Sequence, residues 1–287
     1  MSSSTISPST TSAATATLPG RPLSLRAELR RQLSRRRTLW SFVLLLALPL
    51  VIVAAFALGD GDPSEGSLVD LATGGAANFA IFTTAVSSSF LLIVLAALFV
   101  GDSLPSEASW STLRYLLLAP VPRARLLASK LVVGLASTAV AVVALIGWSL
   151  LVGLVFYGPA GFSNPSGGTL DWATFGPRLV VVAAYLVVTL LPVGAIAFAL
   201  GVRTDAPLAA VGGAVMVTIV AAILDQIDNL GSLRNALPMH DAGAWFALLR
   251  PEVVWDDLVQ GTLWSVLYTL VFVGLAFWMF RRKDVLS

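Results

Sequence analysis

The chain has 287 residues, of which 57% are hydrophobic and only 12% are charged. Because a soluble globular protein usually has about 25% charged residues, this composition excludes an ordinary water-soluble domain and favours a protein that lies in a bilayer. The absence of cysteine excludes disulfides, thiol catalysis and thiolate metal sites, and the single histidine argues against an imidazole-rich metal centre.

The N-terminal part divides into two segments. Residues 1–20 are rich in Ser, Thr, Ala and Pro, which predicts a disordered cytoplasmic tail. Residues 21–38 place leucines at 25, 29 and 33 among arginines, which predicts an amphipathic helix on the membrane surface; a basic tail with some local helix is the alternative. The arginines of this interfacial helix that we expect at the membrane surface are Arg26, Arg30, Arg31, Arg35, Arg36 and Arg37.

The rest of the chain, residues 39–287, contains six apolar stretches. Each has about the 20 residues that a helix needs to cross a bilayer, and period-2 alternation is missing. We therefore expect an all-α integral membrane protein with six transmembrane helices. The predicted spans are residues 39–58, 79–100, 131–157, 178–200, 207–224 and 262–280.

The basic residues predict the orientation. Fifteen of the 18 Lys and Arg residues lie before the first predicted span, between spans two and three, between four and five, or after six. By the positive-inside rule this side faces the cytoplasm, so both termini are expected to be cytoplasmic. The expected location is the plasma membrane of a bacterial-type cell, as a multi-pass protein.

The predicted spans carry no group that drives chemistry or transport. No Asp, Glu, Lys, Arg or His falls inside the six apolar cores, whereas proton-coupled and ion-coupled carriers usually place such groups at membrane depth. The sequence also lacks a G-x-x-x-x-G-K-[ST] phosphate loop and the common hydrolase motifs. We expect no catalytic and no metal-binding residues, and any energy must come from a partner.

The segment from Gly101 to Lys130 is the most elaborate polar loop on the cytoplasmic side. A helix is expected from Glu107 to Leu118, with Ser106 as its N-cap and a leucine face that can rest on the membrane. Its other face, with Glu107, Ser111 and Arg114, can contact a soluble protein. The alternative is a plain interfacial connector whose basic residues only follow the positive-inside rule.

This loop resembles the loop between spans two and three of ABC-2 type transporter permeases, and the six-span layout resembles that family as well. One departure is Ser111, where the family often has Gly. The matching residues are Glu107, Ser111–Thr112–Leu113–Arg114, Leu116–Leu117–Leu118, Pro120–Val121–Pro122–Arg123, Leu126–Leu127 and Lys130.

The resemblance implies the membrane subunit of an ATP-binding-cassette exporter, without enzymatic activity of its own. The implied partners are a cytoplasmic ATPase subunit that binds ATP and Mg, a second permease copy or a paralogue, and the lipid bilayer; no nucleic acid is expected. The residues expected to contact the ATPase are Glu107, Trp110, Ser111, Arg114, Arg123 and Arg125. The alternatives are a membrane scaffold that recruits a cytoplasmic partner and an ATP-independent sodium-coupled carrier.

The longest external loop is expected between Asp225 and Gln260. Its apolar pieces around Trp245 predict short helices that turn back toward the membrane, and an ordinary surface loop with aromatic anchors is equally compatible. We expect His240 to be a surface residue, and the acids near it, Asp225 and Asp241 among them, to be solvated rather than to bind a cation.

Overall fold

The computed structural model describes residues 25–59, 67–109, 123–164 and 168–282. The predicted tail 1–20 and most of the predicted loop helix lie outside these residues. The elements are α1 (Leu25–Ser34), α2 (Arg36–Leu58), α3 (Leu68–Thr73), α4 (Ala76–Ser89), α5 (Leu91–Gly101), α6 (Pro105–Ser109), α8 (Arg123–Tyr157), β1 (Phe162–Ser163), β2 (Thr169–Leu170), α9 (Trp172–Arg203), α10 (Pro207–Asp225), η1 (Asp228–Ala236), η2 (His240–Leu249) and α11 (Asp256–Arg282).

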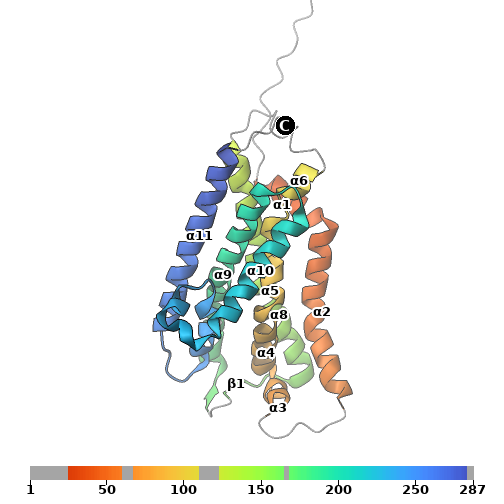
Figure 1. Cartoon of the computed structure of the whole chain (residues 1–287). Coiled ribbons are helices and arrows are strands. Elements are labelled where there is room, and N and C mark those ends of the chain that lie inside the picture. The colour runs from red at the N-terminus through yellow and green to blue at the C-terminus, as the bar shows by residue number, and fades with distance from the viewer. Residues whose placement is uncertain (1–24, 60–66, 110–122, 165–167, 283–287) are drawn as a thin grey trace, which may run out of the picture.

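The long helices run side by side along one axis (Figure 1). Five of them, α2, α8, α9, α10 and α11, are long and apolar enough to cross a membrane. The fold of the described residues is thus almost entirely helical and of the membrane-protein type. Its only strands are β1 and β2, an antiparallel pair in which Phe162 lies opposite Leu170. We call the end with α1, α6, the start of α8 and the end of α11 the basic end.

The predicted span 79–100 is divided into two helices. α4 and α5 meet at Phe90, which has a non-helical backbone (φ −146°, ψ −55°), and their axes differ by 56°. The stretch expected as one span is therefore bent near its middle. The pair forms either a broken span or a re-entrant turn.

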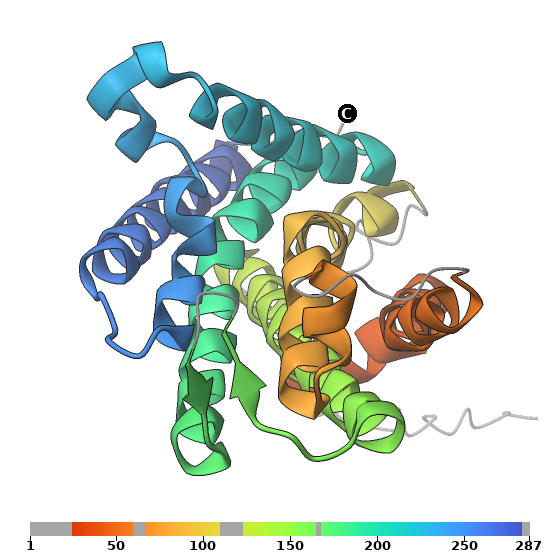
Figure 2. The same ribbon diagram turned by 90° about the horizontal axis from the view of Figure 1, so that it is seen from below.

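The helix α9 is the centre of the bundle, and it contacts α5, α8, α10, α11 and η2. Figure 2 shows α9 inside the bundle and α2 at its edge. The contact with α5 relies on small residues, because a Cβ on Gly201 would lie 2.8 Å from the carbonyl oxygen of Gly101. Around this contact the core is filled by buried apolar side chains such as Phe99, Leu190 and Val193.

The helix α2 is attached to the bundle through α8. The Trp148 indole of α8 donates a 2.8 Å hydrogen bond to the Leu46 carbonyl, in the turn before Pro49. Proline has no N–H, so the Leu45 carbonyl, one residue before Leu46, loses its helical donor, and the indole bond to Leu46 is a further contact between the two helices. Much of the rest of α2 is exposed, including Trp40, which is 70% accessible.

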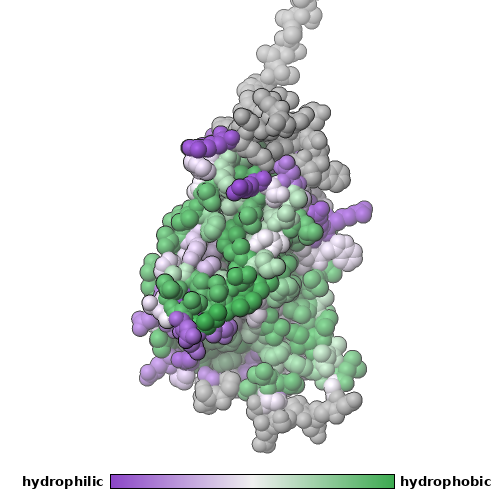
Figure 3. Space-filling view, in the orientation of Figure 1, coloured by the Kyte–Doolittle hydropathy of each residue, from purple (hydrophilic) through white to green (hydrophobic). Residues whose placement is uncertain are grey.

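The exposed surface between the two ends is apolar. Figure 3 shows hydrophilic residues gathered toward the two ends of the molecule and a hydrophobic surface between them. Large apolar side chains that are more than half exposed come from the outer helices, for example Val51 of α2, Leu208 of α10 and Leu270 of α11. A soluble monomer rarely exposes so large an apolar surface, so this band is consistent with lipid contact.

A prediction arises from the close contact between α8 and α5. A Cβ on Gly134 would lie 2.9 Å from the Phe99 carbonyl oxygen and 3.0 Å from the Val100 Cα, whereas Gly147 of the same helix has nothing within 4 Å. We expect Gly134→Val to destabilise the protein by about 1–3 kcal/mol through overpacking, and Gly147→Val to cost much less. Thermal unfolding of both variants in one detergent checks this, and equal losses would contradict it.

Candidate functional site

The helix α1 turns its polar side toward the bundle. Glu28 and Gln32 are only 3% and 6% exposed, whereas Leu25, Leu29 and Leu33 are 40–53% exposed. The Gln32 side chain donates a hydrogen bond to the Phe99 carbonyl of α5, at 3.1 Å. The leucine stripe predicted from the sequence exists, and the opposite face of the helix is fixed to the protein by polar contacts.

The polar face of α1 meets a completely buried lysine. Lys130 lies in α8, and its Nζ atom is 3.0 Å from Glu28 Oε1 of α1 and 2.6 Å from Glu107 Oε1 of α6. One ammonium group therefore joins three helices that lie far apart in the sequence. It is compensated by two carboxylates, as a buried charge requires.

Three arginines and one more acid extend this group. Arg31 Nη1 is 3.2 Å from Glu107 Oε1, and Arg35 donates to the Ser106 hydroxyl at 3.0 Å. Asp102, at the C-terminal end of α5, pairs with both Arg35 and Arg37. We call this set the Lys130 cluster. Its members are Glu28, Arg31, Arg35, Arg37, Asp102, Glu107 and Lys130.

The exposure predicted for the Glu107 carboxylate was wrong, because this residue belongs to the Lys130 cluster. We expected its carboxylate on a face offered to a soluble partner, but the residue is only 6% exposed and binds Lys130 and Arg31. The physical reason is that the buried ammonium group of Lys130 would be costly without a counter-ion, and Glu107 supplies one. In addition, α6 begins at Pro105, so Ser106 lies in its first turn instead of capping it.

The other predicted contact residues are divided between described and undescribed parts of the chain. Trp110, Ser111 and Arg114 lie outside the described residues, and so does the side chain of Arg123. Arg125 is exposed in the first turn of α8. It makes no ion pair within the part of the chain that the structure describes.

The arginines predicted for the membrane surface fall into two groups. Arg30 and Arg36 are exposed, and the side chain of Arg26 lies outside the described part. The remaining three of that set, Arg31, Arg35 and Arg37, bind acids of the protein itself. Half of the predicted surface arginines therefore hold α1 and the start of α2 to the ends of α5 and α6.

A second polar cluster lies at the opposite end, around His240. Its Nδ1 atom is in hydrogen-bond contact with Asp225, and its Nε2 atom is 3.8 Å from Asp241 Oδ1. The Tyr185 hydroxyl donates to the Asp241 carbonyl at 2.7 Å, which ties α9 to η2. The histidine side chain is 20% exposed, so His240 is partly covered and lies against two acids of the protein.

The helical segments around this cluster were predicted in part. Two short helices, η1 and η2, do follow α10, as expected. Trp245 of η2 is 1% exposed and belongs to the main core, so it is not an aromatic anchor at the headgroups. No group of three His, Cys, Asp or Glu side chains able to hold a metal ion occurs in the described ranges.

The pKa of Asp241 predicts an effect of pH at this end. Burial raises the pKa of its carboxyl group; Asp257 and Asp225 add to the rise, and His240 opposes it. The folded state therefore binds a proton more tightly than the unfolded chain, and stability falls as pH rises from about 4 through the raised pKa. We expect Asp241→Asn to remove this fall, as measured by melting temperature from pH 4 to 7.

The matched control for that prediction is Asp171→Asn. A hydrogen bond from Thr174 lowers the pKa of this exposed N-cap carboxyl, so its contribution has the opposite sign and is lost only as pH falls below about 4. If both variants left the pH profile between 4 and 7 unchanged, the role of Asp241 would be contradicted.

The fold and the Lys130 cluster define a helical protein of the membrane type, in which a buried ion network closes the basic end. A model of the family described as a protein of unknown function (DUF2705) matches residues 67–286. The chain therefore belongs to this family. No curated protein matches the sequence.

Proposed function

We propose that the chain is the membrane-spanning permease subunit of an ATP-binding-cassette exporter in a bacterial-type plasma membrane. The observation that carries the proposal is the Lys130 cluster. It fastens α1 and the segment that leads into residues 110–122 to α8, which runs the length of the bundle. A permease subunit that is driven by a cytoplasmic ATPase needs a rigid junction. Through it, force on a surface helix and a loop can pass to a long helix of the bundle.

In this proposal the chain crosses the membrane six times. The bent pair α4 and α5 counts as one broken span beside the five long helices. Both termini lie in the cytoplasm because the basic end carries most of the Lys and Arg residues. The exposed leucines of α1 lie in the bilayer surface, while its polar face holds the Lys130 cluster.

The proposed mechanism transmits force, and the chain itself does no chemistry. ATP and Mg²⁺ bind to a separate ATPase, which presses on α1 and on the loop 102–130. Because Lys130 joins both to α8, a displacement of either passes to the helices that α8 contacts, among them α4, α5 and α9. The break at Phe90 provides a hinge, since no continuous helical hydrogen bonding stiffens that point.

Co-purification with an ATPase tests the proposal. The ATPase to use is one that carries a phosphate loop and is encoded beside this chain. We expect the two to purify as a complex from detergent and to raise each other's melting temperature. Separate elution with no mutual stabilisation, or solute flux by this chain in liposomes without any ATPase, would contradict the proposal.

A further inference from the structure

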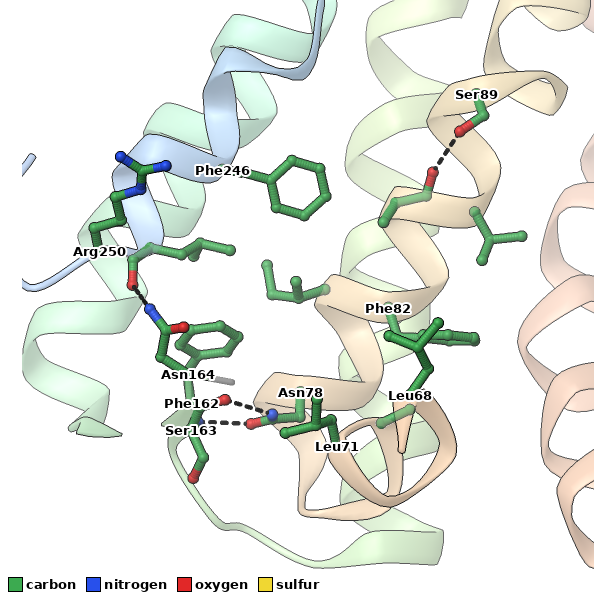
Figure 4. Close-up of a pocket in the computed structure, with 15 residues that line it drawn as sticks. Leu68, Leu71, Asn78, Phe82, Ser89, Phe162, Ser163, Asn164, Phe246 and Arg250 are labelled. Atoms are coloured by element: carbon green, nitrogen blue, oxygen red, sulfur yellow. Dashed lines mark hydrogen bonds between the residues drawn. The ribbon is translucent and has the colours of Figure 1, made fainter. Parts of the chain in front are cut away.

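Two adjoining cavities lie in the half of the bundle away from the basic end. The larger, of about 590 Å³, lies between α3, α4, β1 and η2 (Figure 4). The smaller, of about 440 Å³, is lined by α4, α5, α9, α10 and η2. Ala85, Ser89 and Phe246 line both, and Figure 4 shows the Phe246 ring extending from η2 toward α4. We call them the paired cavities.

The two asparagine side chains of the larger cavity are already used by the protein. Asn78 donates to the Ser163 carbonyl at 2.9 Å and accepts from the Ser163 amide at 2.8 Å. The Asn164 side chain donates to the Leu249 carbonyl at 3.4 Å. The surface left for a ligand comes mainly from apolar side chains such as Ile81 and Phe82, which suits a hydrocarbon chain.

The smaller cavity is lined by four hydroxyl groups and by the Gln226 side chain. Ser88 and Ser89 donate to the Ala85 carbonyl at 2.9 and 3.1 Å. Thr189 donates to Leu186 and Thr218 to Ala214, at 3.1 and 3.0 Å. A hydroxyl has one hydrogen to donate, so toward a ligand each of these oxygens can act only as an acceptor. A ligand that pairs with them must bring its own hydrogen-bond donors.

Among the residues that the structure describes, the walls of the paired cavities carry one ionisable side chain, that of Arg250. Figure 4 shows its guanidinium group on the side of η2 away from α4. A charged group inside would lose its hydration without gaining a counter-ion, which costs several kcal/mol. An ionic ligand is therefore disfavoured.

We propose that the paired cavities bind an uncharged amphiphile, with its hydrocarbon chain in the larger cavity and a hydroxyl- or amide-bearing head in the smaller one. Their volumes lie within the range of about 300–1,000 Å³ that is usual for small-molecule sites. The inference that the bound molecule is also the transported molecule rests on the proposed function. The inference that the paired cavities bind an uncharged amphiphile does not depend on it.

Binding is tested with the full chain in nanodiscs, without any ATPase. The probe is a monoacylglycerol with a diazirine in its chain, and the products are mapped by mass spectrometry. We expect labelling of α4 and η2 that saturates and is displaced by monooleoylglycerol. Methyl oleate, which has no donor, and oleyl sulfate, which is charged, should compete at least about fivefold less well.

Two pairs of variants locate the site. Ala85→Trp fills the place where the cavities adjoin and should reduce labelling at least about tenfold, whereas Ala54→Trp, on the exposed side of α2, should not. Thr218→Val removes one acceptor and should weaken binding about three- to tenfold. Thr84→Val is its control, because this buried threonine makes the same bond to its own helix and lines neither cavity.

The site is contradicted by labelling that does not saturate, by oleyl sulfate competing as well as monooleoylglycerol, or by equal effects of the two threonine variants. None of these results bears on the ATPase. Conversely, failure of the chain to bind an ATPase would overturn the proposed function and leave the ligand site in place.

Discussion

Replacing Lys130 by methionine is expected to destabilise the protein by about 3–5 kcal/mol, because the change leaves buried carboxylates without their cation. Glu28 and Glu107 are both more than nine-tenths buried, and each has its Oε1 atom on the lysine. Arg31 also reaches Glu107, at 3.2 Å, so the loss should fall toward the lower end of this range. Chemical or thermal unfolding in detergent measures it.

Two further variants make this prediction specific. Arg203→Met removes an exposed cation at the end of α9 and should change stability by less than about 1 kcal/mol. The triple variant Lys130→Met, Glu28→Gln, Glu107→Gln should recover most of the loss, because no buried charge is left unpaired; Arg31, which loses both its acids, is 40% exposed to solvent. If Lys130→Met were as mild as Arg203→Met, the cluster would not hold the basic end together.

Reversing the charge of Arg125 is expected to weaken ATPase binding at least about tenfold, which corresponds to about 1.4 kcal/mol. Arg125 is exposed, lies three residues after residue 122, and lies little more than one turn before the buried Lys130. A negative charge there would face the proposed partner without disturbing the ion network. The affinity of purified Arg125→Glu for the ATPase, against that of the unchanged chain, checks this.

The control for Arg125→Glu is Arg250→Glu, an equal change at an exposed arginine of the opposite end. It should leave the affinity unchanged, and both variants should melt at the temperature of the unchanged chain. Equal losses of affinity in the two variants would show that the net charge of the chain controls ATPase binding. They would contradict a contact between the ATPase and the basic end.

The long helices could be predicted from the sequence because 20 or so apolar residues in a row have few other structures available. The prediction for residues 39–58 matches α2, which ends at Leu58. The break at Phe90 could not be predicted in this way. It directly follows Ser87–Ser88–Ser89, whose hydroxyls bond to carbonyls of α4, and no proline or glycine marks it.

The Lys130 cluster was missed for a related reason. Glu28, Glu107 and Lys130 are separated by up to 102 residues, so no local pattern connects them. A signal was nevertheless present: Glu28 is the one acid in the basic segment before the first span. An acid surrounded by arginines at the start of a membrane domain is worth testing as a partner for a lysine that opens another span.

The measurement that tests the central claim most directly is ATP hydrolysis by the neighbouring ATPase in nanodiscs. It is recorded without this chain, with the chain, and with the Arg125→Glu variant. Coupling at the basic end predicts that the chain changes the rate severalfold and that the variant has lost most of this effect. The same rate in all three preparations would contradict a permease driven by that ATPase.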